Sequence, residues 1–464
     1  MINTEESFRD SLATVDDDGN RKWVYPKKPS GKFHNYRVIV SLILLTLLFS
    51  GPFIKINGNP LLLLNVIERK FVIFGNVFYP QDFYIFMFVM AVGVIAIGIF
   101  TLVFGRLFCG WVCPQTIFME MVFRKIEYWI EGDWNKQKAL NKADMSPSKF
   151  FKKTLKHVIF FAVSFIISNT FLAYIIGIEE LLEIMMAPPS EHIWGFFSIL
   201  LFAFAFYIVF SRLREQICTS VCPYGRLQGV LLDQHSIVVA YDYKRGENRA
   251  KFRKNEDRAE QGKGDCVDCR QCINVCPTGI DIRNGTQLEC VHCTACIDAC
   301  DSIMDKLSLP GGLIRYTSEY HIKNESKLKL NKRTIGFSVL LVVLTGIILG
   351  LLLLRNKVEI TVLRTPGTLS QEQPDGKISN LYNYNIVNKS NEDFSLDFKL
   401  ESLTGEVQLI GDSAVTLPKG EKTAGTFFII LDKEQLKARQ TPIRIGIYHQ
   451  EEKVDEVNTN FLKK

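Results

Sequence analysis

Five stretches of the chain are apolar over a length that suits a membrane-spanning helix, which takes about 20 residues. They cover residues 37–54, 82–104, 155–176, 193–210 and 334–354. The first stretch is the least regular, because Gly51-Pro52 interrupts its end. The pattern predicts an α-helical transmembrane bundle of about five spans.

Basic residues between these stretches predict how the spans are oriented. Six Lys and Arg residues precede the first span, nine lie in segment 105–154 and twenty in segment 211–333. Segment 55–81 has three and segment 177–192 has none. Because basic loops stay on the cytoplasmic side, we expect a cytoplasmic N-terminus and a C-terminus on the outer side.

The C-terminal part of the chain follows a different pattern, in which polar and apolar residues alternate. The alternation is clearest in six runs, at 358–363, 381–387, 394–400, 406–410, 425–431 and 443–449. A period of two is typical of half-buried strands. Several short strands in this length predict an immunoglobulin-like β-sandwich, which we interpret as a structural or docking module.

Twelve cysteines form four groups, and two of the groups share the spacing C-x2-C-x2-C-x3-C. This run holds cubane iron–sulfur clusters in bacterial ferredoxins, where the fourth cysteine of each run binds the other cluster. The expected first ligand set is therefore Cys266, Cys269, Cys272 and Cys300. The expected second ligand set is Cys290, Cys293, Cys296 and Cys276. The two runs predict a bacterial ferredoxin domain with two four-iron (4Fe-4S) clusters that transfer single electrons.

Zinc is the alternative occupant of these runs, because C-x2-C pairs also bind zinc and two tetrahedral sites would use all eight thiolates. Pro277, directly after the first run, favours the ferredoxin interpretation. A disulfide framework suits small secreted scaffolds rather than a loop between membrane spans.

The other four cysteines form two C-x3-C-P motifs, each just past the predicted cytoplasmic end of a span. Cys109 and Cys113 precede Pro114, and Cys218 and Cys222 precede Pro223. The prolines indicate a break in the local helix. Both pairs lie at one membrane level, so they can converge into a four-thiolate site for a soft metal such as Cu(I). Two alternatives stay open: buried apolar cysteines at helix ends, and disulfide chemistry.

Two residues beside the cysteines have simpler interpretations. Arg106 and the segment 225–228 fit the excess of basic residues on the cytoplasmic side better than an anion site. His292 lies between cysteines of the second run and is expected to pack or to tune the site rather than to bind metal. The net charge of +6 is mild and forms no basic stripe, so nucleic-acid binding is not indicated.

These features divide the chain into five parts. The expected parts are a cytoplasmic tail at 1–36, four spans with both C-x3-C-P motifs at 37–230, a cytoplasmic ferredoxin domain at 231–333, a fifth span at 334–354, and a periplasmic sandwich at 355–464.

The motifs together resemble the cytochrome c oxidase accessory protein family called CcoG, also FixG or RdxA. The resemblance rests on Arg106 to Thr116, Glu127 to Asp133, Cys218 to Gly225, and the double ferredoxin run through Met304. It extends to the last span and the β-rich tail. Asp301 stands where ferredoxins usually have proline, a departure that the family shares.

The resemblance implies a polyferredoxin of the bacterial cytoplasmic (inner) membrane that helps to assemble a cbb-type heme–copper oxidase. The implied activity is the reduction of Cu(II) to Cu(I), which would make the protein a cupric reductase. By position, the eight cysteines of the two runs match the family's cluster ligands. Cys109, Cys113, Cys218 and Cys222 match its membrane-proximal motifs. The implied partners are copper ions, oxidase subunits or assembly factors, and membrane lipid, with a homodimer as a possibility.

Two other functions compete with this one. The chain could be the electron-transfer subunit of a quinol-oxidising respiratory complex, since membrane ferredoxins of nitrate and nitrous-oxide respiration share the C-x3-C-P pairs. It could also be a thiolate copper chaperone whose clusters sense redox state. The electron donor is not predicted, because no Gly-rich dinucleotide fingerprint follows a strand in this sequence.

Overall fold

The computed structural model describes most of the chain. The described residues are 14–15, 18–56, 58–79, 83–253, 256–258, 260–324, 332–353, 358–365, 370–373, 376–390, 392–411, 415–436, 438–450 and 452–463. Residues 1–13 and 16–17 of the predicted tail, residue 82 of the predicted second span and residue 354 of the predicted fifth span lie outside them. The chain divides into two compact units, which are described separately. The first comprises residues 1–51, 87–173 and 178–347, and the second comprises 52–86, 174–177 and 348–464.

Within the described residues, five helical segments are long and apolar enough to cross a membrane. They correspond to α1 (Lys32–Ser50), α2 (Phe83–Phe104), α7 (Pro147–Ile176), α9 (Ile193–Ile208), which a π-type turn continues to Leu213, and α15 (Lys332–Leu353). Each of the five predicted stretches falls on one of them, and the structure confirms a bundle of five candidate spans. Helix α7 begins well before its apolar stretch. Its first turns are polar and carry Lys153 and Lys156, whose ammonium groups lie 2.8 and 2.9 Å from the Glu131 carboxylate.

Short helices connect the spans within the first unit. They are α3 (Leu107–Trp111), α4 (Pro114–Ile117), α5 (Arg124–Ile130), α6 (Trp134–Lys142), α8 (Ile178–Met186) and α10 (Pro223–Leu231). Wider π-type turns cover Phe118–Phe123, Val209–Leu213 and Ile217–Val221. Aromatic rings fill the space between these connectors and the spans, with Phe123 stacked on Phe210 at 4.5 Å between ring centroids.

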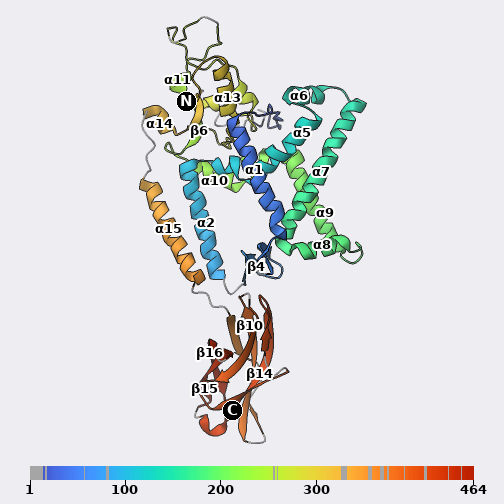
Figure 1. Ribbon diagram of the computed structural model, residues 1–464, viewed down its shortest axis with the longest axis vertical. Helices are drawn as coiled ribbons and strands as arrows, with labels where there is room; N and C mark the ends of the chain where they lie inside the picture. The colour runs from blue at the N-terminus through green and yellow to red at the C-terminus, as the bar shows by residue number, and fades with distance from the viewer. Residues whose placement is uncertain are drawn as a thin grey trace. The chain divides into compact units, whose positions relative to one another are not determined.

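The ferredoxin region is a small α/β layer at one end of α1 and α2 (Figure 1). Its elements are β6 (Val238–Tyr241), α11 (Tyr243–Gly246), α12 (Gln271–Asn274), α13 (Ala295–Lys306), β7 (Ile314–Thr317) and α14 (Glu319–Asn324). Strands β6 and β7 pair antiparallel and bracket the cysteine-rich loops. The α13 residue Asp298 accepts hydrogen bonds from the backbone N–H groups of Phe33 (3.1 Å) and His34 (2.7 Å) at the start of α1. A carboxylate at a helix N-terminus satisfies unpaired N–H groups, so this contact ties the ferredoxin region to the first span.

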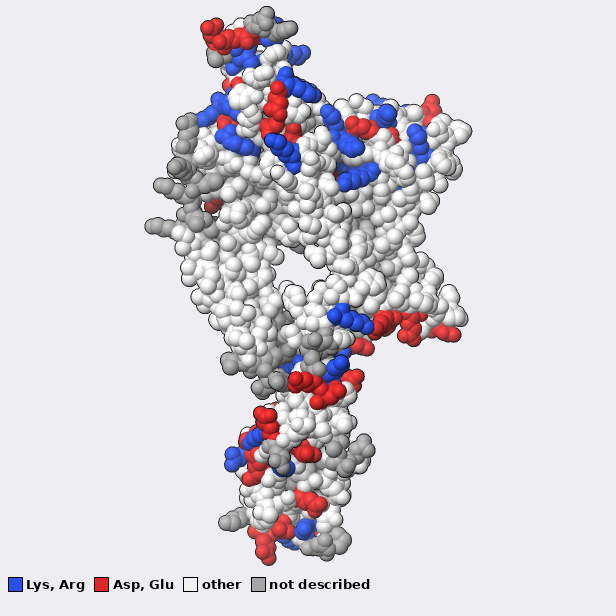
Figure 2. Space-filling model, in the orientation of Figure 1, with Lys and Arg blue, Asp and Glu red and all other residues white. Residues whose placement is uncertain are grey.

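Charged side chains are distributed unevenly along the first unit. The helices form a belt with few charged side chains, and Lys and Arg gather at the end next to the ferredoxin region (Figure 2). Lys28, Lys32 and Lys125 are among the exposed cations there. The exposed Glu179 and Glu180 belong to α8, which follows the far end of α7. Cations are therefore concentrated at the ferredoxin end of the apolar belt, where Asp and Glu side chains also lie.

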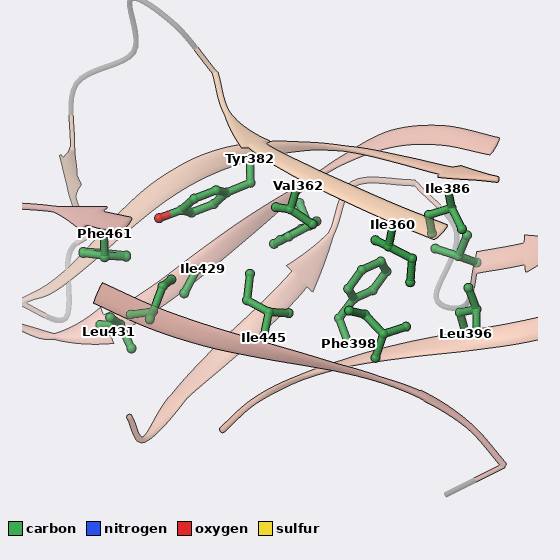
Figure 3. Packing of buried hydrophobic residues seen from close by; sticks show 14 of the residues in the cluster. Ile360, Val362, Tyr382, Ile386, Leu396, Phe398, Ile429, Leu431, Ile445 and Phe461 are labelled. Carbon is green, nitrogen blue, oxygen red and sulfur yellow. The ribbon is translucent and has the colours of Figure 1, made fainter. Parts of the chain in front are cut away.

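The C-terminal part of the second unit is a two-sheet antiparallel sandwich, as predicted. One sheet has the order β12-β14-β10-β8, with β9 paired to β10, and the other has the order β13-β11-β15-β16. The strands are β8 (Val358–Arg364), β9 (Gln371–Glu372), β10 (Lys377–Asn388), β11 (Phe394–Leu400), β12 (Gly405–Leu409), β13 (Val415–Leu417), β14 (Lys422–Asp432), β15 (Gln440–His449) and β16 (Glu452–Leu462). The inward side chains form one core, in which Tyr382, Val362, Ile429 and Phe461 face one another (Figure 3).

The segment between the first two spans contains strands that were not predicted, and it folds as part of the second unit. It forms β1 (Lys55–Ile56), β2 (Asn59–Pro60), β3 (Leu62–Asn65), β4 (Lys70–Ile73) and β5 (Asn76–Phe78). Its apolar residues Val72 and Val77 pack with Val387 of the sandwich. The Tyr79 hydroxyl donates a 2.7 Å hydrogen bond to the carbonyl of Gly420. The sandwich is thus extended by a small sheet from a distant part of the chain.

Candidate functional site

The two ferredoxin runs fold into loops with the same backbone pattern. Asp268 and Arg270 have positive φ angles of 49° and 56°, and the equivalent His292 and Thr294 have φ angles of 53° and 62°. Non-glycine residues adopt this region only where the surroundings hold them there. Such alternation turns successive backbone N–H groups toward one centre, an arrangement found at iron–sulfur sites. The repeat in sequence is therefore also a repeat in conformation.

The cysteines of the runs sort into two groups by their electrostatic neighbours. The Cys300 thiol interacts with those of Cys266, Cys269 and Cys272. The Cys296 thiol interacts most strongly with those of Cys293, Cys290 and Cys276. Cys300 and Cys276 thus lie near the cysteines with which the spacing pairs them, and the assignment of the two ligand sets stays a prediction.

The donor atoms of the two runs are of the kind that four-iron clusters require. Cys272, Cys276, Cys290, Cys293 and Cys296 line one cavity together with apolar side chains. Within the described residues, no three His, Cys, Asp or Glu side chains converge closely enough to hold a single metal ion. A cubane is larger than one ion, so its thiolates stand farther apart than those of a tetrahedral zinc site. The same finding applies to the C-x3-C-P cysteines, so it does not distinguish the metals, and the iron–sulfur interpretation rests on the spacing of the runs and on Pro277.

Burial shapes the chemistry of these thiols. Burial raises the pKa of Cys272 and of Cys300 to about 12, and the neighbouring thiols contribute to both shifts. In the second set, burial raises the pKa of Cys290 to about 12 and of Cys293 to about 11. As free thiols these groups would keep their protons at neutral pH, so cluster binding must release them.

The two C-x3-C-P motifs share one local structure. The N–H of Cys113 donates to the Phe108 carbonyl (2.9 Å), and the N–H of Cys222 donates to the Ile217 carbonyl (2.7 Å). Each bond spans five residues and widens the turn. The second cysteine of each motif then caps a new helix, α4 or α10, with proline at its first turn. The predicted break in the helix is confirmed, and it presents the two sulfurs of each motif from different elements.

The four motif thiols lie within electrostatic range of one another. Burial raises the pKa of Cys218 to about 12, and Cys113, Cys109 and Cys222 raise it further. Burial likewise raises the pKa of Cys109 to about 11, with Cys113 and Cys222 contributing. All four are partly buried. The structure therefore brings both motifs into one group, which we call the four-thiol site.

Cys109 connects the four-thiol site to the second ligand set. It packs against a buried group that contains Val291 and Cys293 of the second run. Gly110, the next residue, approaches so closely that a Cβ atom on it would lie 2.5 Å from the Val291 carbonyl oxygen and 2.8 Å from that of His292. Only glycine allows this approach of α3 to the loop. Cys218 lies on the same side, since it lines a cavity with Pro277, Thr278 and Val291.

A network of polar side chains holds the motifs against the second run. The N–H of Arg106 donates to Nδ1 of His292 (3.0 Å), and the Arg106 guanidinium donates to the carbonyls of Leu288 and Gly225. Trp111 donates to the Tyr316 hydroxyl (3.1 Å), which donates to the His292 carbonyl (3.3 Å). Arg106 is therefore a connecting residue as well as a basic one, and His292 packs within the network as expected. Burial, with the Arg106 charge adding to it, lowers the pKa of His292 to about 3.

Gln228 is a site residue that the sequence analysis missed. Its side chain is fully buried, and its Oε1 accepts a 3.3 Å hydrogen bond from the Cys109 thiol. It lies in the segment 225–228, which was interpreted only through its charge. It lies on α10 six residues after Cys222, and no signal in the sequence marks it as a site residue.

Buried charges form a second polar layer beneath the site. The Glu127 carboxylate pairs with the Arg214 guanidinium and lies 3.6 Å from the Lys156 ammonium. Burial by itself would raise the pKa of Glu127, but Arg214, Lys156 and Arg124 outweigh it and hold the pKa below its usual range. Arg124 also donates a 3.0 Å hydrogen bond to the carbonyl of Pro277, directly after the first run. The layer thus links α5, α7 and the ferredoxin region.

Three family models match parts of the chain. Residues 213–319 match a 4Fe-4S dicluster domain, and residues 86–137 match a 4Fe-4S binding domain. Residues 348–464 match the model described as an IG-like fold at the C-terminus of FixG. The second match covers the first C-x3-C-P motif, which lies outside the two ferredoxin runs.

Whole-length relatives agree with these matches. The chain is 30% identical to Protein RdxA of Cereibacter sphaeroides over 427 residues, which are 89% of this chain and 89% of that protein. It is 30% identical to Nitrogen fixation protein FixG of Rhizobium meliloti over 85% of this chain and 82% of that protein. Protein RdxB of Cereibacter sphaeroides is also 30% identical, over 92% of this chain and 93% of that protein.

Among solved structures, a FixG-related protein from Vibrio parahaemolyticus aligns with 24% of this chain and 99% of its own length. The sequence identity is 20% and the TM-score is 0.21. This alignment is too partial to support an argument about function.

Proposed function

Because this chain belongs to the FixG/RdxA family, we propose that it reduces Cu(II) to Cu(I) at the four-thiol site for the assembly of a cbb-type heme–copper cytochrome c oxidase. The family and the dicluster domain make the chain a membrane iron–sulfur protein of electron transfer. We propose in addition that Cu(II) accepts the electrons and that the resulting Cu(I) is used to assemble the oxidase.

The observation that carries the proposal is the position of Cys109. This residue shares the four-thiol site with Cys113 and Cys222, and it also packs against the buried group that contains Cys293. A metal ion bound by Cys109 would therefore lie next to the second ligand set. Two four-iron clusters, when held by the two sets, supply electrons one at a time.

The residues of the four-thiol site suit the reduction of copper by one electron. Thiolates are soft ligands that bind Cu(I) more favourably than harder cations. A Cu(II) ion held by Cys109, Cys113, Cys218 and Cys222 gains one electron and becomes the better bound ion. The thiols release their protons when the metal binds. Before metal binds, Gln228 accepts a hydrogen bond from the Cys109 thiol and so orients that side chain.

We further propose that the four-thiol site and the ferredoxin region face the cytoplasm, across the bacterial inner membrane from the sandwich. Exposed cations gather at the ferredoxin end of the apolar belt, and the exposed acidic residues of α8 follow its other end. Basic segments stay inside, which supports this orientation. Oxidase subunits or copper-delivering assembly factors are then the partners of the chain.

Anaerobic stopped-flow mixing tests the proposal. Purified protein with dithionite-reduced clusters is mixed with Cu(II) in the presence of a Cu(I)-specific chelator. We expect the clusters to be reoxidised while one chelated Cu(I) forms for each electron lost. Reoxidation by a quinone analogue with no response to copper would instead support a respiratory subunit. Binding of copper without reoxidation would support a chaperone, and either result would overturn the proposal.

A further inference from the structure

The two ligand sets differ in their access to solvent. Of the twelve cysteines, all of which lie in the described part of the chain, Cys269 of the first set alone is exposed. The second set is covered, because α3 lies against its loop through the close contact at Gly110. The first set is therefore the side at which an external protein can approach a cluster, and the second set is the side that adjoins Cys109.

The surface around Cys269 is basic and partly aromatic. Segment 249–253 runs beside the first run, since the N–H of Ala250 donates to the Cys266 carbonyl at 3.2 Å. Lys251 and Arg253 are exposed, and Phe252 between them is 42% exposed. Arg270, directly after Cys269, has 70% of its side chain exposed. We call Lys251, Phe252, Arg253 and Arg270 the basic rim.

Four of the carboxylates near the basic rim are matched by other cations, and the exposed Asp257 and Glu260 lie farther along the loop. Glu247 pairs with Arg249 at 2.6 Å, and Asp268 pairs with Arg283 at 2.6 Å and lies 4.0 Å from Arg270. Farther along the loop, Asp265 pairs with Arg245 and Glu256 pairs with Lys263. Lys251 and Arg253 form no ion pair with any residue that the structure describes. The basic rim therefore keeps a net positive charge.

From this arrangement we infer that the basic rim is the docking surface for a small, acidic, soluble one-electron carrier protein that reduces the cluster held by the first ligand set. A cubane accepts one electron at a time, so its donor must release single electrons. Exposed cations around an aromatic side chain suit a negatively charged partner, whose approach they accelerate. In each encounter one electron passes from the reduced carrier to the oxidised cluster, and no bond is formed or broken. The inference rests on the iron–sulfur electron transfer of the family and does not depend on copper as the acceptor.

A charge-reversal variant tests the docking surface in the full-length protein. Lys251→Glu with Arg253→Glu changes two residues that are not adjacent to a cluster ligand. The probe is a reduced, acidic two-iron ferredoxin, mixed anaerobically with protein in detergent. We expect the rate of cluster reduction at low salt to fall by about tenfold or more, and its dependence on salt to weaken. The dissociation constant of the oxidised ferredoxin, measured by titration, should rise to a similar extent.

Two controls make the result specific. Lys136→Glu with Lys138→Glu reverses two exposed charges on α6, and this variant should keep the original rate. The charge-reversed protein should still be reduced by dithionite to the full extent and should still be reoxidised by Cu(II). Equal rates and equal affinities for the rim variant and the unchanged protein would overturn the inference. A loss of Cu(II) reactivity in both proteins would count against the proposed copper reduction alone.

Discussion

At the scale of single residues, the spacing of the cysteines predicts their role as ligands, whereas the residues that surround them are known only from the fold. Spacing alone assigns the two ligand sets, because three thiolates at close intervals suit one cubane. Gln228 carries no such mark, since an amide becomes a site residue only through the fold that buries it beside Cys109. Arg106 and His292 likewise reveal their contact only in three dimensions, because they lie far apart in the sequence.

Replacing the first motif's thiols separates the two kinds of site. We expect Cys109→Ser with Cys113→Ser to abolish the yield of Cu(I), because the soft ligands beside the second set are lost. The variant should retain about eight iron atoms per chain, as two four-iron clusters require. Iron analysis and the Cu(I) chelator assay check both expectations. The matched change Cys272→Ser should lower the iron content first, and loss of iron from the motif variant would show that its thiols are cluster ligands.

Glu127 should make stability depend on pH in the acidic range. Its folded pKa lies below the unfolded value of about 4.3, so its contribution is present above that pH and is lost as the pH falls through the folded pKa. Glu127→Gln leaves the buried Arg214 without its partner and should cost about 3 kcal/mol at pH 7. Thermal unfolding of both proteins checks this from pH 7 to pH 3.

The difference between the two unfolding curves is the informative quantity, because both proteins carry the same clusters. We expect the gap in midpoint to be largest at neutral pH and to narrow below about pH 4.5. A gap that stayed constant over this range would mean that the carboxylate charge of Glu127 contributes nothing.

At the scale of elements, hydrophobic periodicity predicted the spans and most strands of the sandwich but missed elements with polar sequences. β16 was not predicted, because its sequence Glu452–Leu462 is largely polar and Phe461 is its one fully buried side chain. The small strands between the first two spans were not predicted, because their core is completed by Val387, a residue far away in the chain. Five of the six alternating runs of the sandwich fall within observed strands, and the sixth, 406–410, extends one residue past the end of β12.

Helix α3 should lose its contact with the second run when Gly110 gains a side chain. Gly110→Ala brings a Cβ atom against two backbone carbonyls, which cannot rotate away. We expect a loss of about 1–3 kcal/mol in stability and slower transfer of electrons to copper. Thermal unfolding and stopped-flow reoxidation measure the two effects.

Gly93→Ala on α2 is the matched control, because a Cβ atom there meets no heavy atom within 4 Å. Both substitutions gain the same helix propensity, so the comparison isolates the crowding. If the two variants behaved alike in stability and rate, the close approach of α3 would have no role.

At the scale of the whole molecule, we propose that the ferredoxin region and the sandwich lie on opposite sides of the membrane. We expect a membrane-impermeant thiol reagent to reach a single cysteine introduced at Ser402, in the sandwich, from outside intact cells. Ser308→Cys, after α13, should react only when the membrane is opened, because basic segments hold the ferredoxin region inside. Both tests are made in a chain whose exposed Cys269 is occupied by its cluster. Labelling of position 308 in intact cells would reverse the proposed orientation.

The central claim is that copper is reduced on thiolates beside the second ligand set. X-ray absorption at the copper edge tests it most directly, on protein reduced with dithionite, freed of excess reductant and mixed anaerobically with one equivalent of Cu(II). We expect a Cu(I) edge and a first coordination shell of the copper that contains sulfur alone. In the variant with all four motif cysteines changed to serine, this sulfur shell should be lost. A Cu(II) edge with nitrogen or oxygen ligands, while the clusters stay reduced, would contradict it.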